Sequence, residues 1–592
     1  MSLIKQIEGD LTKKMNEAAI PIERVTLLES KRKDLGDYQL NDAMSLAKIL
    51  HKSPMLIAED MKRILEESGY FDNVTIASIG FINVSLKEEI LVNFVNNYYN
   101  NSDKDVDLLE KKKIFLDYGG ANIAKTLHVG HLRSANIGEA LKRLTKRLGQ
   151  EVICDVHFGD IGRQSGMVIY EIRNRYPNLN YFTEEESNNW DELPITAKDL
   201  EEIYPVASLK AKEDENIMEE VRLITKELEE GKPSYVALWD KIKKISIEDI
   251  KGIYKKFNTD FDLWEGESDC YSYMGPMLEN LRTQGYLQKS EGAEVIEVRE
   301  DTDKAPMPDL VVVKSNGATL YATRELATMV SRVERFNPDE MWYLTDLRQG
   351  LYFEQVFRAA HKTKIVSDDT KLSFFGFGTM NGPDGKPFKT RDGGALSLKS
   401  LLKEVKEEVT AHSHNLENET NKEEIIEQIA VAAIKYADLL SNRTTDYIFD
   451  PKKFVDVEGK TGPYLLYTTI RMKSLLKKAK ENNLNYKKYN SITNEVEKEL
   501  ITLLLNKNKI LHKAYDTKEL NVISDYLYQL TSTYSKFYEK CHVLTENNKN
   551  IQENWLLLTK NVYDVIKQKE DKIAGALYKD LGKSKSEAYM CE

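Results

Sequence analysis

Residues 122–134 contain the side chains best suited to chemistry, because a lysine, two histidines and a glycine lie close together there. They are Lys125, His128, Gly130 and His131. The segment follows a predicted strand and opens a predicted helix, where free backbone N–H groups and the helix dipole favour a bound phosphate. The imidazoles would add donors for the phosphate oxygens, Gly130 permits close approach, and Lys125 adds a positive charge. This pattern predicts a phosphate-binding site.

Two other interpretations of these residues remain open at this point. The histidines could be ordinary surface residues without a ligand. They could also bind zinc, since H-x-x-H occurs in metal sites. Zinc is the weaker alternative, because no third ligand lies nearby and no general-base glutamate lies between His128 and His131.

The residues around this segment alternate between predicted strands and predicted helices. Short apolar runs predict strands at 114–118, 152–156, 341–345 and 372–377. Apolar residues at helical spacing from 137 to 148 predict a helix that ends at Gly149. The alternation predicts a doubly wound α/β domain with a parallel sheet, and the acidic segment at 178–262 predicts a helical insertion.

Different patterns flank this α/β domain. On its N-terminal side, helical spacing at 40–50 and strand patterns at 74–77 and 81–84 predict a small α+β unit. After Leu396 the pattern is helical, with no convincing strand. We therefore expect an N-terminal domain, an α/β domain, a helical junction and an all-α C-terminal domain over 1–110, 111–395, 396–459 and 460–592.

The composition is that of a folded, multidomain protein. Of 592 residues, 41% are hydrophobic and 30% are charged, and no apolar run approaches the roughly 18–20 residues that span a bilayer. The start of the chain lacks the apolar core of a signal peptide. The four cysteines, which are far apart and show no C-x-x-C spacing, predict no disulfide framework. We expect a cytoplasmic protein with no membrane partner.

Charge is distributed unevenly along the chain. The whole chain carries −12, but residues 460–592 contain 23 basic and 16 acidic residues, a net +7, which leaves −19 for the rest. The same C-terminal stretch contains 12 of the 31 tyrosines. A basic, tyrosine-rich end predicts a module that binds a polyanion, although a lysine-rich, solvated helical bundle has the same composition.

The sequence His128-Val129-Gly130-His131 resembles the HIGH signature of class I aminoacyl-tRNA synthetases, and residues 122–134 resemble its form in arginyl-tRNA synthetases. Further blocks resemble that family in the same order, at 36–41, 80–83, 157–164, 321–325, 346–349, 435–443 and 458–464. The resemblance implies a Rossmann-like class I catalytic domain, a small α+β N-terminal domain that contacts tRNA, and an all-α C-terminal anticodon-binding domain.

The resemblance also implies an activity, that of an ATP-dependent arginine–tRNA ligase. L-arginine and ATP would give arginyl-adenylate and pyrophosphate, and arginine would then pass to the 3′ end of tRNA(Arg). Magnesium would arrive with ATP through phosphate and water ligands, so no tightly bound protein metal is expected. The expected partners are tRNA(Arg), L-arginine and ATP, and the expected form is a monomer. The resemblance implies that bound tRNA is needed before arginine is activated.

A pocket for arginine needs acceptors, because a guanidinium is planar, permanently charged and carries five N–H donors. By resemblance, the arginine site consists of Asp117, Asn122, His128, Tyr321, Glu325 and Gln349. Asp117 and Glu325 would take the guanidinium, with Tyr321 as a third polar contact. Asn122 and Gln349 would hold the α-amino and carboxylate groups.

Glu325 departs from the family, which usually has aspartate at this position. The extra methylene moves the carboxylate by about 1.5 Å, one bond length, which changes the bidentate geometry but keeps the charge. A different interpretation places Tyr321 and Glu325 at an exposed helix start, where Glu325 pairs with Arg324 or Arg332.

ATP is expected to contact the signature and the loop after the next strand, through Lys125, His128, Val129, Gly130, His131, Gly159, Asp160 and Lys389. The second class I signature, K-M-S-K-S, has no good match. The glycine-flanked basic loop at 385–394 is the nearest candidate, with Lys386 and Lys389 as mobile phosphate clamps; an ordinary surface loop is the alternative. Lys125 matches the lysine that some relatives carry upstream of the first signature. The expected catalytic residues are Lys125, His128, Gly130, His131, Lys386 and Lys389.

The C-terminal domain would hold the anticodon stem and loop, with lysines on the backbone and aromatic rings on unpaired bases. The candidate tRNA contacts are Tyr464, Tyr467, Arg471, Tyr538, Tyr589 and Met590. The region at 552–556 departs from the family, which more usually has an arginine there. Each tyrosine could equally be a helix-packing residue.

Two rival functions differ from this interpretation. A class I synthetase for another amino acid would leave the carboxylates of Asp117 and Glu325 without a cationic partner. A non-catalytic tRNA-binding relative would have no need for Lys125, His128 and His131 as a phosphate site. The sequence therefore favours the arginine–tRNA ligase.

Overall fold

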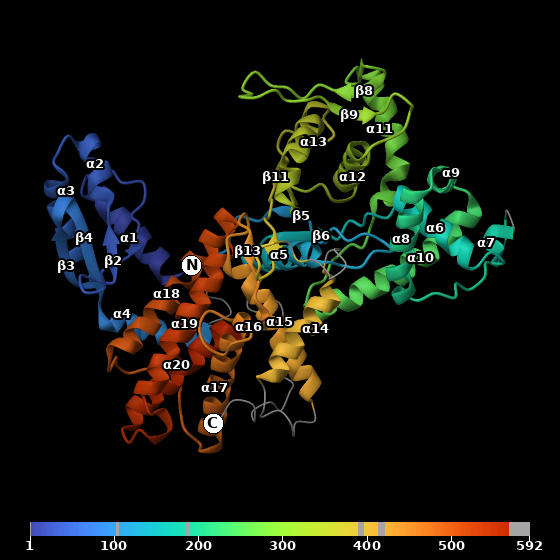
Figure 1. Cartoon of the computed structure of the whole chain (residues 1–592). Helices are drawn as coiled ribbons and strands as arrows, with labels where there is room; N and C mark the ends of the chain where they lie inside the picture. The colour runs from blue at the N-terminus through green and yellow to red at the C-terminus, as the bar shows by residue number, and fades with distance from the viewer. Residues whose placement is uncertain are drawn as a thin grey trace.

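The structure is a computed structural model that describes residues 2–101, 106–183, 186–187, 189–386, 388, 396–412 and 421–567. Figure 1 shows an N-terminal unit in blue at one side, a central α/β region, and a bundle of C-terminal helices in orange and red. A group of helices in cyan and green extends from the central region on the side away from the N-terminal unit.

The N-terminal unit is a small α+β domain, as predicted. Its elements are α1 (Leu3–Glu17), β1 (Leu28–Glu29), β2 (Tyr38–Leu40), α2 (Asp42–Leu50), α3 (Pro54–Glu67), β3 (Phe71–Ala77), β4 (Phe81–Leu86) and α4 (Glu88–Asn101). The sheet is antiparallel in the order β1-β2-β4-β3, and α3 packs against β3 and β4. Helix α1 begins where the Ser2 hydroxyl accepts a hydrogen bond from Lys5 N–H.

Residues 36–41 join this unit to the C-terminal helix α18 (Glu495–Thr517). Lys498 Nζ lies 2.9 Å from Asp37 Oδ1, and the buried Tyr38 hydroxyl donates to Asn506 Oδ1 at 3.2 Å. Helix α4 packs against α18 and α20 (Lys549–Lys567). The N-terminal domain is therefore attached to the C-terminal helices through polar as well as apolar contacts.

The central sheet is parallel, as the alternation of strands and helices predicts. Its strands are β5 (Lys113–Asp117), β6 (Glu151–Asp155), β10 (Glu340–Tyr343) and β11 (Lys371–Phe374), in the order β11-β10-β5-β6. Helices α5 (Val129–Arg147), α12 (Tyr321–Phe336) and α13 (Gly350–Lys362) accompany it. Because all four strands run in one direction, their carboxyl ends share one edge, and the loops with the predicted site residues start there.

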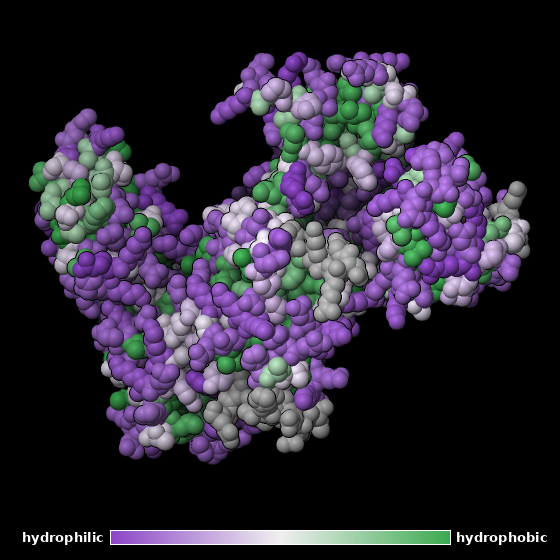
Figure 2. All heavy atoms as spheres, viewed as in Figure 1, coloured by the Kyte–Doolittle hydropathy of each residue, from purple (hydrophilic) through white to green (hydrophobic). Residues whose placement is uncertain are grey.

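Two groups of elements interrupt this sheet. The helical insertion predicted over 178–262 is present as α7 (Asn180–Thr183), α8 (Ala197–Glu213), α9 (Glu215–Glu229) and α10 (Pro233–Lys256), and α6 (Arg163–Arg175) precedes it. After α11 (Tyr271–Thr283) comes an antiparallel sheet that the sequence analysis did not predict, with strands β7 (Gln288–Ser290), β8 (Ala293–Ile296) and β9 (Leu310–Val313). Three or four residues per strand leave too little periodicity to detect. Figure 2 shows a hollow between this second group and the helical insertion.

The C-terminal region is helical, with one correction to the prediction. Its helices are α14 (Leu398–Ala411), α15 (Lys422–Leu440), α16 (Pro451–Phe454), α17 (Gly462–Glu481), α18, α19 (Asn521–Lys540) and α20. The expectation of no strand after Leu396 is wrong, because β13 (Tyr447–Ile448) pairs in parallel with β12 (Met380–Asn381). A two-residue strand has no alternation that a sequence could reveal. In the described part of the chain, no helix is long and apolar enough to cross a membrane.

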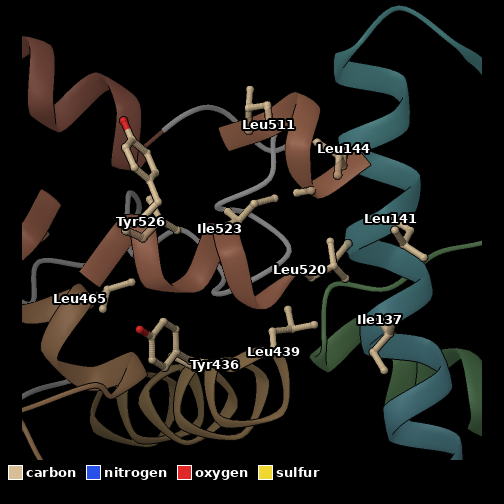
Figure 3. Close-up of a cluster of buried hydrophobic side chains, with 14 of the residues drawn as sticks. Ile137, Leu141, Leu144, Tyr436, Leu439, Leu465, Leu511, Leu520, Ile523 and Tyr526 are labelled. Atoms are coloured by element: carbon tan, nitrogen blue, oxygen red, sulfur yellow. The ribbon is translucent and has the colours of Figure 1, made fainter. Parts of the chain in front are cut away.

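Helix α5 anchors the signature segment to the C-terminal helices. Figure 3 shows Ile137, Leu141 and Leu144 on one side of α5, facing apolar side chains of the C-terminal helices. Arg133 adds a buried ion pair, with Nε 2.9 Å from Asp438 Oδ1 on α15. The start of α5 is therefore held rigidly at the edge of the sheet.

Candidate active site

His128 is the N-cap residue of α5 and fixes the shape of the signature turn. Its Nδ1 accepts a hydrogen bond from Gly130 N–H, and His131 Nδ1 accepts one from His128 N–H, both at 3.1 Å. Because both Nδ1 atoms accept, each neutral ring carries its proton on Nε2. Burial and the charge of Lys125 lower the pKa of both imidazoles, that of His131 to about 3. The turn therefore supplies two neutral N–H donors at a helix start.

Two glycines allow the close contacts in this turn. A Cβ atom on Gly130 would lie 2.9 Å from His128 Cε1, and one on Gly159 would lie 2.5 Å from Asn122 Oδ1. Ile123 N–H donates to Gly159 O at 3.1 Å and joins the loop after β5 to the loop after β6. Both glycines are therefore required by the available space, and they hold Asn122 against the second loop.

Lys125 lies against the helical insertion. Its Nζ lies 4.5 Å from the ring centroid of Tyr204 on α8, a cation–π contact. Its neighbour Ala124 donates through N–H to Ser246 Oγ on α10 at 3.0 Å. The insertion thus positions the loop that carries this lysine.

The ends of the predicted basic loop meet the signature turn. Val129 N–H donates to Leu396 O at 3.3 Å, and Leu396 N–H donates to Phe388 O at 3.3 Å. Lys386 is exposed in the turn that precedes Phe388. Lys389 lies outside the described residues. The described flanks therefore bring the start and the end of this loop together beside the start of α5.

A second cluster of charged side chains lies where β5 and β6 end. Arg332 of α12 places Nη2 2.6 Å from Asp117 Oδ2 and 3.1 Å from Asp155 Oδ2. Its guanidinium carbon lies 4.5 Å and 5.5 Å from the ring centroids of Phe115 and Tyr343. One oxygen of Asp117, which is predicted to take a substrate guanidinium, is thus held by a guanidinium of the chain itself.

His157 belongs to this cluster, although the sequence analysis did not select it as a site residue. Its Nδ1 lies 3.4 Å from Asp155 Oδ2. Burial opposes its charge, but Asp155 and Asp117 outweigh that effect and raise its pKa to about 9. Asp117, Asp155 and His157 offer ligand atoms within 4.8 Å of one another, a spacing that suits a metal ion, but Arg332 already places a positive charge between the two carboxylates.

Glu325 is the carboxylate of this cluster that lacks a partner. Its Oε1 is fully enclosed and forms no hydrogen bond with any residue that the structure describes. Burial raises its pKa to about 7 against the opposing charges of His157 and Arg332. Arg332 does not fill the role that the exposed-helix interpretation gave it, because it pairs with Asp117 instead. An enclosed carboxylate without a donor needs a proton or an added cation.

Glu267 brings another carboxylate to the cluster, and the sequence analysis missed it. It lies in the 3₁₀ turn Glu267–Cys270, and its Oε2 lies 2.9 Å from Arg324 Nη1. The guanidinium carbon of Arg324 lies 4.7 Å from the ring centroid of Tyr321, a side chain that is itself 65% exposed. Burial raises the pKa of Glu267, and Arg324 opposes that rise. The sequence offers only a slight signal here, a glycine between two glutamates.

The cluster contains one more carboxylate than it contains cationic groups. Its carboxylates are Asp117, Asp155, Glu267 and Glu325, and its cationic groups are Arg324, Arg332 and His157. Tyr352 of α13, also missed, adds a phenol whose pKa is raised by burial and by Glu325. A proton on Glu325 makes the number of negative and positive charges in the cluster equal. A bound cation would take the place of that proton.

Two of the predicted ligand contacts, Asp160 and Gln349, are associated with 3₁₀ turns. Asp160, expected to contact ATP, is 2% exposed and accepts hydrogen bonds from the Ser268 N–H, at 2.9 Å, and from the Ser268 hydroxyl. It therefore fixes the turn that carries Glu267. Gln349 is exposed at the end of the 3₁₀ turn Leu347–Gln349, which follows β10.

The predicted tRNA contacts divide into a stack, a separate tyrosine and a pair that lies outside the described residues. Arg471 lies between two rings, with its guanidinium carbon 4.4 Å from the centroid of Tyr467 and 5.0 Å from that of Tyr538. Tyr464 shares a hydrogen bond of 3.0 Å with Ser535 Oγ. The pair outside the described residues is Tyr589 and Met590.

Three family models match the chain in succession. The arginyl tRNA synthetase N terminal domain matches residues 2–86, and the catalytic domain of class I (R) tRNA synthetases matches residues 94–451. The DALR anticodon binding domain matches residues 465–570. The catalytic model thus spans the parallel sheet, the insertion and both groups of side chains described above.

Relatives of known name match over nearly the whole chain. The arginine–tRNA ligase of Alkaliphilus oremlandii is 41% identical over 572 residues, which are 95% of this chain and 97% of the relative. That of Agathobacter rectalis is 41% identical over 582 residues, again 95% of this chain and 97% of the relative.

Solved structures show the same fold. The arginyl-tRNA synthetase of Plasmodium falciparum has a TM-score of 0.78 at 24% identity, and the match covers 97% of this chain and 98% of that one. The arginyl-tRNA synthetase of Thermus thermophilus has a TM-score of 0.75 at 19% identity with the same coverage. From the family models and the sequence relatives, the chain belongs to the arginyl-tRNA synthetase family of class I aminoacyl-tRNA synthetases.

Proposed function

We propose that this chain is an arginine–tRNA ligase that activates L-arginine with ATP and transfers it to tRNA(Arg). The observation that carries this proposal is the enclosed Oε1 of Glu325, a carboxylate oxygen that finds no donor among the described residues, in a cluster where carboxylates outnumber cationic groups by one. A guanidinium is the side-chain group that best meets this need, because it is permanently charged and presents several donors in one plane.

The signature turn would act on ATP. The Nε2–H donors of His128 and His131, together with the start of α5, would stabilise negative charge on the phosphates as pyrophosphate leaves. Lys125 would leave the Tyr204 ring and reach the same phosphates, and Lys386 and Lys389 would close on them from the adjacent loop. Val129 and Gly159 would line the nucleotide, and Asp160 would act on it by fixing the Glu267 turn.

The reaction needs no nucleophile from the protein. The carboxylate of arginine attacks the α-phosphorus, the bond to pyrophosphate breaks, and arginyl-adenylate forms. A ribose hydroxyl at the 3′ end of tRNA then attacks the arginyl carbonyl, and AMP leaves. The chain contributes orientation and charge stabilisation in both steps.

In the arginine pocket, Glu325 and Glu267 would take the guanidinium, with Tyr321 beside it. Asp117, expected to do the same, has one oxygen on Arg332 and so would share its carboxylate with that residue. Asn122 and Gln349 would hold the α-amino and carboxylate groups. This assignment adds Glu267 to the predicted set on the strength of its place in the cluster.

The C-terminal helices would bind the anticodon stem and loop. The stack of Tyr467, Arg471 and Tyr538 offers flat π faces and a charge on which unpaired bases can stack. Tyr464, Tyr589 and Met590 remain proposed contacts from the sequence. We further propose that the protein acts as a cytoplasmic monomer and that Mg²⁺ arrives bound to ATP.

Arginine-dependent ATP–pyrophosphate exchange, with and without the matching tRNA, tests this function. We expect exchange with arginine and none with the other amino acids. If this exchange also requires tRNA, the result supports the mechanism implied by the family. Exchange without tRNA would keep the function and remove that requirement. A folded protein that binds tRNA but shows no exchange under either condition would favour the non-catalytic relative.

A further inference from the structure

Arg324 lies where a substrate guanidinium is proposed to bind. Its Nη1 is 2.9 Å from Glu267 Oε2, and its guanidinium carbon is 4.7 Å from the centroid of the Tyr321 ring. The paired side chains are largely enclosed, with 12% of Arg324 and 17% of Glu267 exposed. Glu325, the residue that follows Arg324, has the enclosed oxygen without a donor. An arginine of the chain therefore occupies part of the pocket for the arginine substrate.

The fit of Arg324 in this position is incomplete. Within the described part of the chain, its enclosed Nε has no hydrogen-bond partner, and Glu267 Oε2 has an ion-pair distance without a hydrogen bond of good geometry. Enclosed donors and acceptors without partners are costly. A free arginine, unconstrained by the α12 backbone, can place its planar donors against both Glu267 and Glu325, so it can satisfy groups that Arg324 leaves unsatisfied.

The other guanidinium of the cluster has more partners than Arg324, although its enclosed Nη1 also lacks a hydrogen bond to the described residues. Arg332 is only 3% exposed, contacts two aspartates at 2.6 and 3.1 Å, and lies over two aromatic rings. Arg324 has one ion pair and a more exposed side chain.

We propose that Arg324 is an internal substitute for the substrate guanidinium. It pairs with Glu267 until L-arginine enters, and it then gives up this contact to the substrate guanidinium. This proposal rests on the proposed function, because it takes the pocket to be one for arginine. Arg324 then lowers the affinity for arginine, because only molecules in which Arg324 has left Glu267 can bind the substrate. The measured dissociation constant is the intrinsic one divided by the fraction of such molecules. It also keeps the charge of Glu267 paired while the pocket is empty.

The Arg324→Met variant of the full chain tests the proposal, with Arg335→Met as the matched control. Arg335 lies on the same helix and pairs with Glu265 at 2.6 Å outside the pocket. Dissociation constants for radiolabelled L-arginine and for citrulline would be measured by equilibrium dialysis without tRNA. If Arg324 fills the pocket in nine molecules of ten, its removal should tighten arginine binding by about tenfold, while Arg335→Met leaves it unchanged.

The gain in Arg324→Met should be confined to the guanidinium ligand, so citrulline binding should change far less. Unchanged or weaker arginine binding in Arg324→Met would overturn the proposal, because either result means that Arg324 does not compete with the substrate. Arg324→Gln, which keeps a polar head without the charge, provides the same test if the methionine variant does not fold. If the natural protein itself does not prefer arginine to lysine and citrulline, the proposed function fails instead.

Discussion

The signature turn, residues 128–131, and the carboxylate pocket, which is the cluster that contains Asp117, Asp155, Glu267 and Glu325, lie at the same edge of one sheet. They differ in how many of their polar groups find partners within the protein. In the turn, both histidines are neutral, both Nδ1 atoms are hydrogen-bonded, and two glycines provide the space. In the pocket, charged groups are enclosed in unequal number, and Glu325 Oε1 has no donor among the described residues. Under the proposed function, the turn needs no rearrangement to receive phosphates, whereas a bound cation would supply the donor that the pocket lacks.

Removing one negative charge from the pocket should strongly weaken arginine binding and leave the signature turn intact. Glu325→Gln removes the partner of the proposed guanidinium, and loss of one member of an enclosed ion pair costs about 3–5 kcal/mol. We expect arginine to bind about 200- to 5,000-fold more weakly in equilibrium dialysis. Glu334→Gln, at an exposed position of the same helix, should bind arginine normally. Equal affinities in the two variants would remove Glu325 from the pocket.

The opposite separation is expected in the turn. His128→Ala and His131→Ala each remove a donor that acts as charge develops on the phosphates, so arginine-dependent exchange should slow by about 10²–10³-fold. Arginine affinity should stay near its natural value in His131→Ala, because, of the two histidines, only His128 is also expected to contact arginine. The exposed His542 provides the control through His542→Ala. An unaltered exchange rate in both signature variants would show that the assigned roles are wrong.

The unequal charge of the pocket also affects stability. The pKa of Glu325 in the folded protein is about 7, against about 4.5 for a free glutamate, so the folded state loses stability as pH rises from about 5 to 7. Without added arginine, Glu325→Gln should therefore stabilise the protein at pH 8 by about 3 kcal/mol, and should have little effect near pH 4.5. Urea unfolding at both pH values measures this. A variant that is less stable at pH 8 would mean that the pocket tolerates the negative charge.

The smallest expected effect is that of pH on arginine affinity. Below about pH 7, Glu325 is protonated and cannot pair with a guanidinium. We expect the dissociation constant for arginine to fall by about fivefold between pH 6 and pH 7, by about tenfold between pH 6 and pH 8, and to level off above pH 8. The same titration with Glu325→Gln should be flat over this range. A slope that persists in the variant would assign the effect to another group.

The turn was easier to predict from the sequence than the pocket, because it is formed by one continuous segment. Residues 122–134 form the turn almost alone, so strand, loop and helix signals in one segment were sufficient. The parallel sheet and the helical insertion were likewise predictable from periodicity. The tRNA synthetase resemblance supplied Tyr321 and Glu325, which no local pattern marks as a pocket.

The rest of the pocket depends on contacts between distant segments. Arg332 reaches Asp117 across 215 positions of the chain, and this contact decides how Asp117 is used. Glu267 lies in a 3₁₀ turn of four residues, too short for any periodicity, and Asp160 holds that turn through Ser268. The charge excess is a property of all these groups together, and it becomes visible only when they are brought into one place.

If the pocket lacks one cation and a proton on Glu325 substitutes for it, then arginine must displace that proton when it binds. Proton release on arginine binding can be measured directly. Isothermal titration calorimetry at pH 7, in two buffers of different ionisation enthalpy, counts the protons released when L-arginine binds to the full chain. About half a proton should be released per arginine bound, because about half of the Glu325 carboxyls are protonated at a pH equal to their pKa. Glu325→Gln should show no such release. Tight arginine binding with no proton released would contradict the claim that a proton on Glu325 substitutes for a cation.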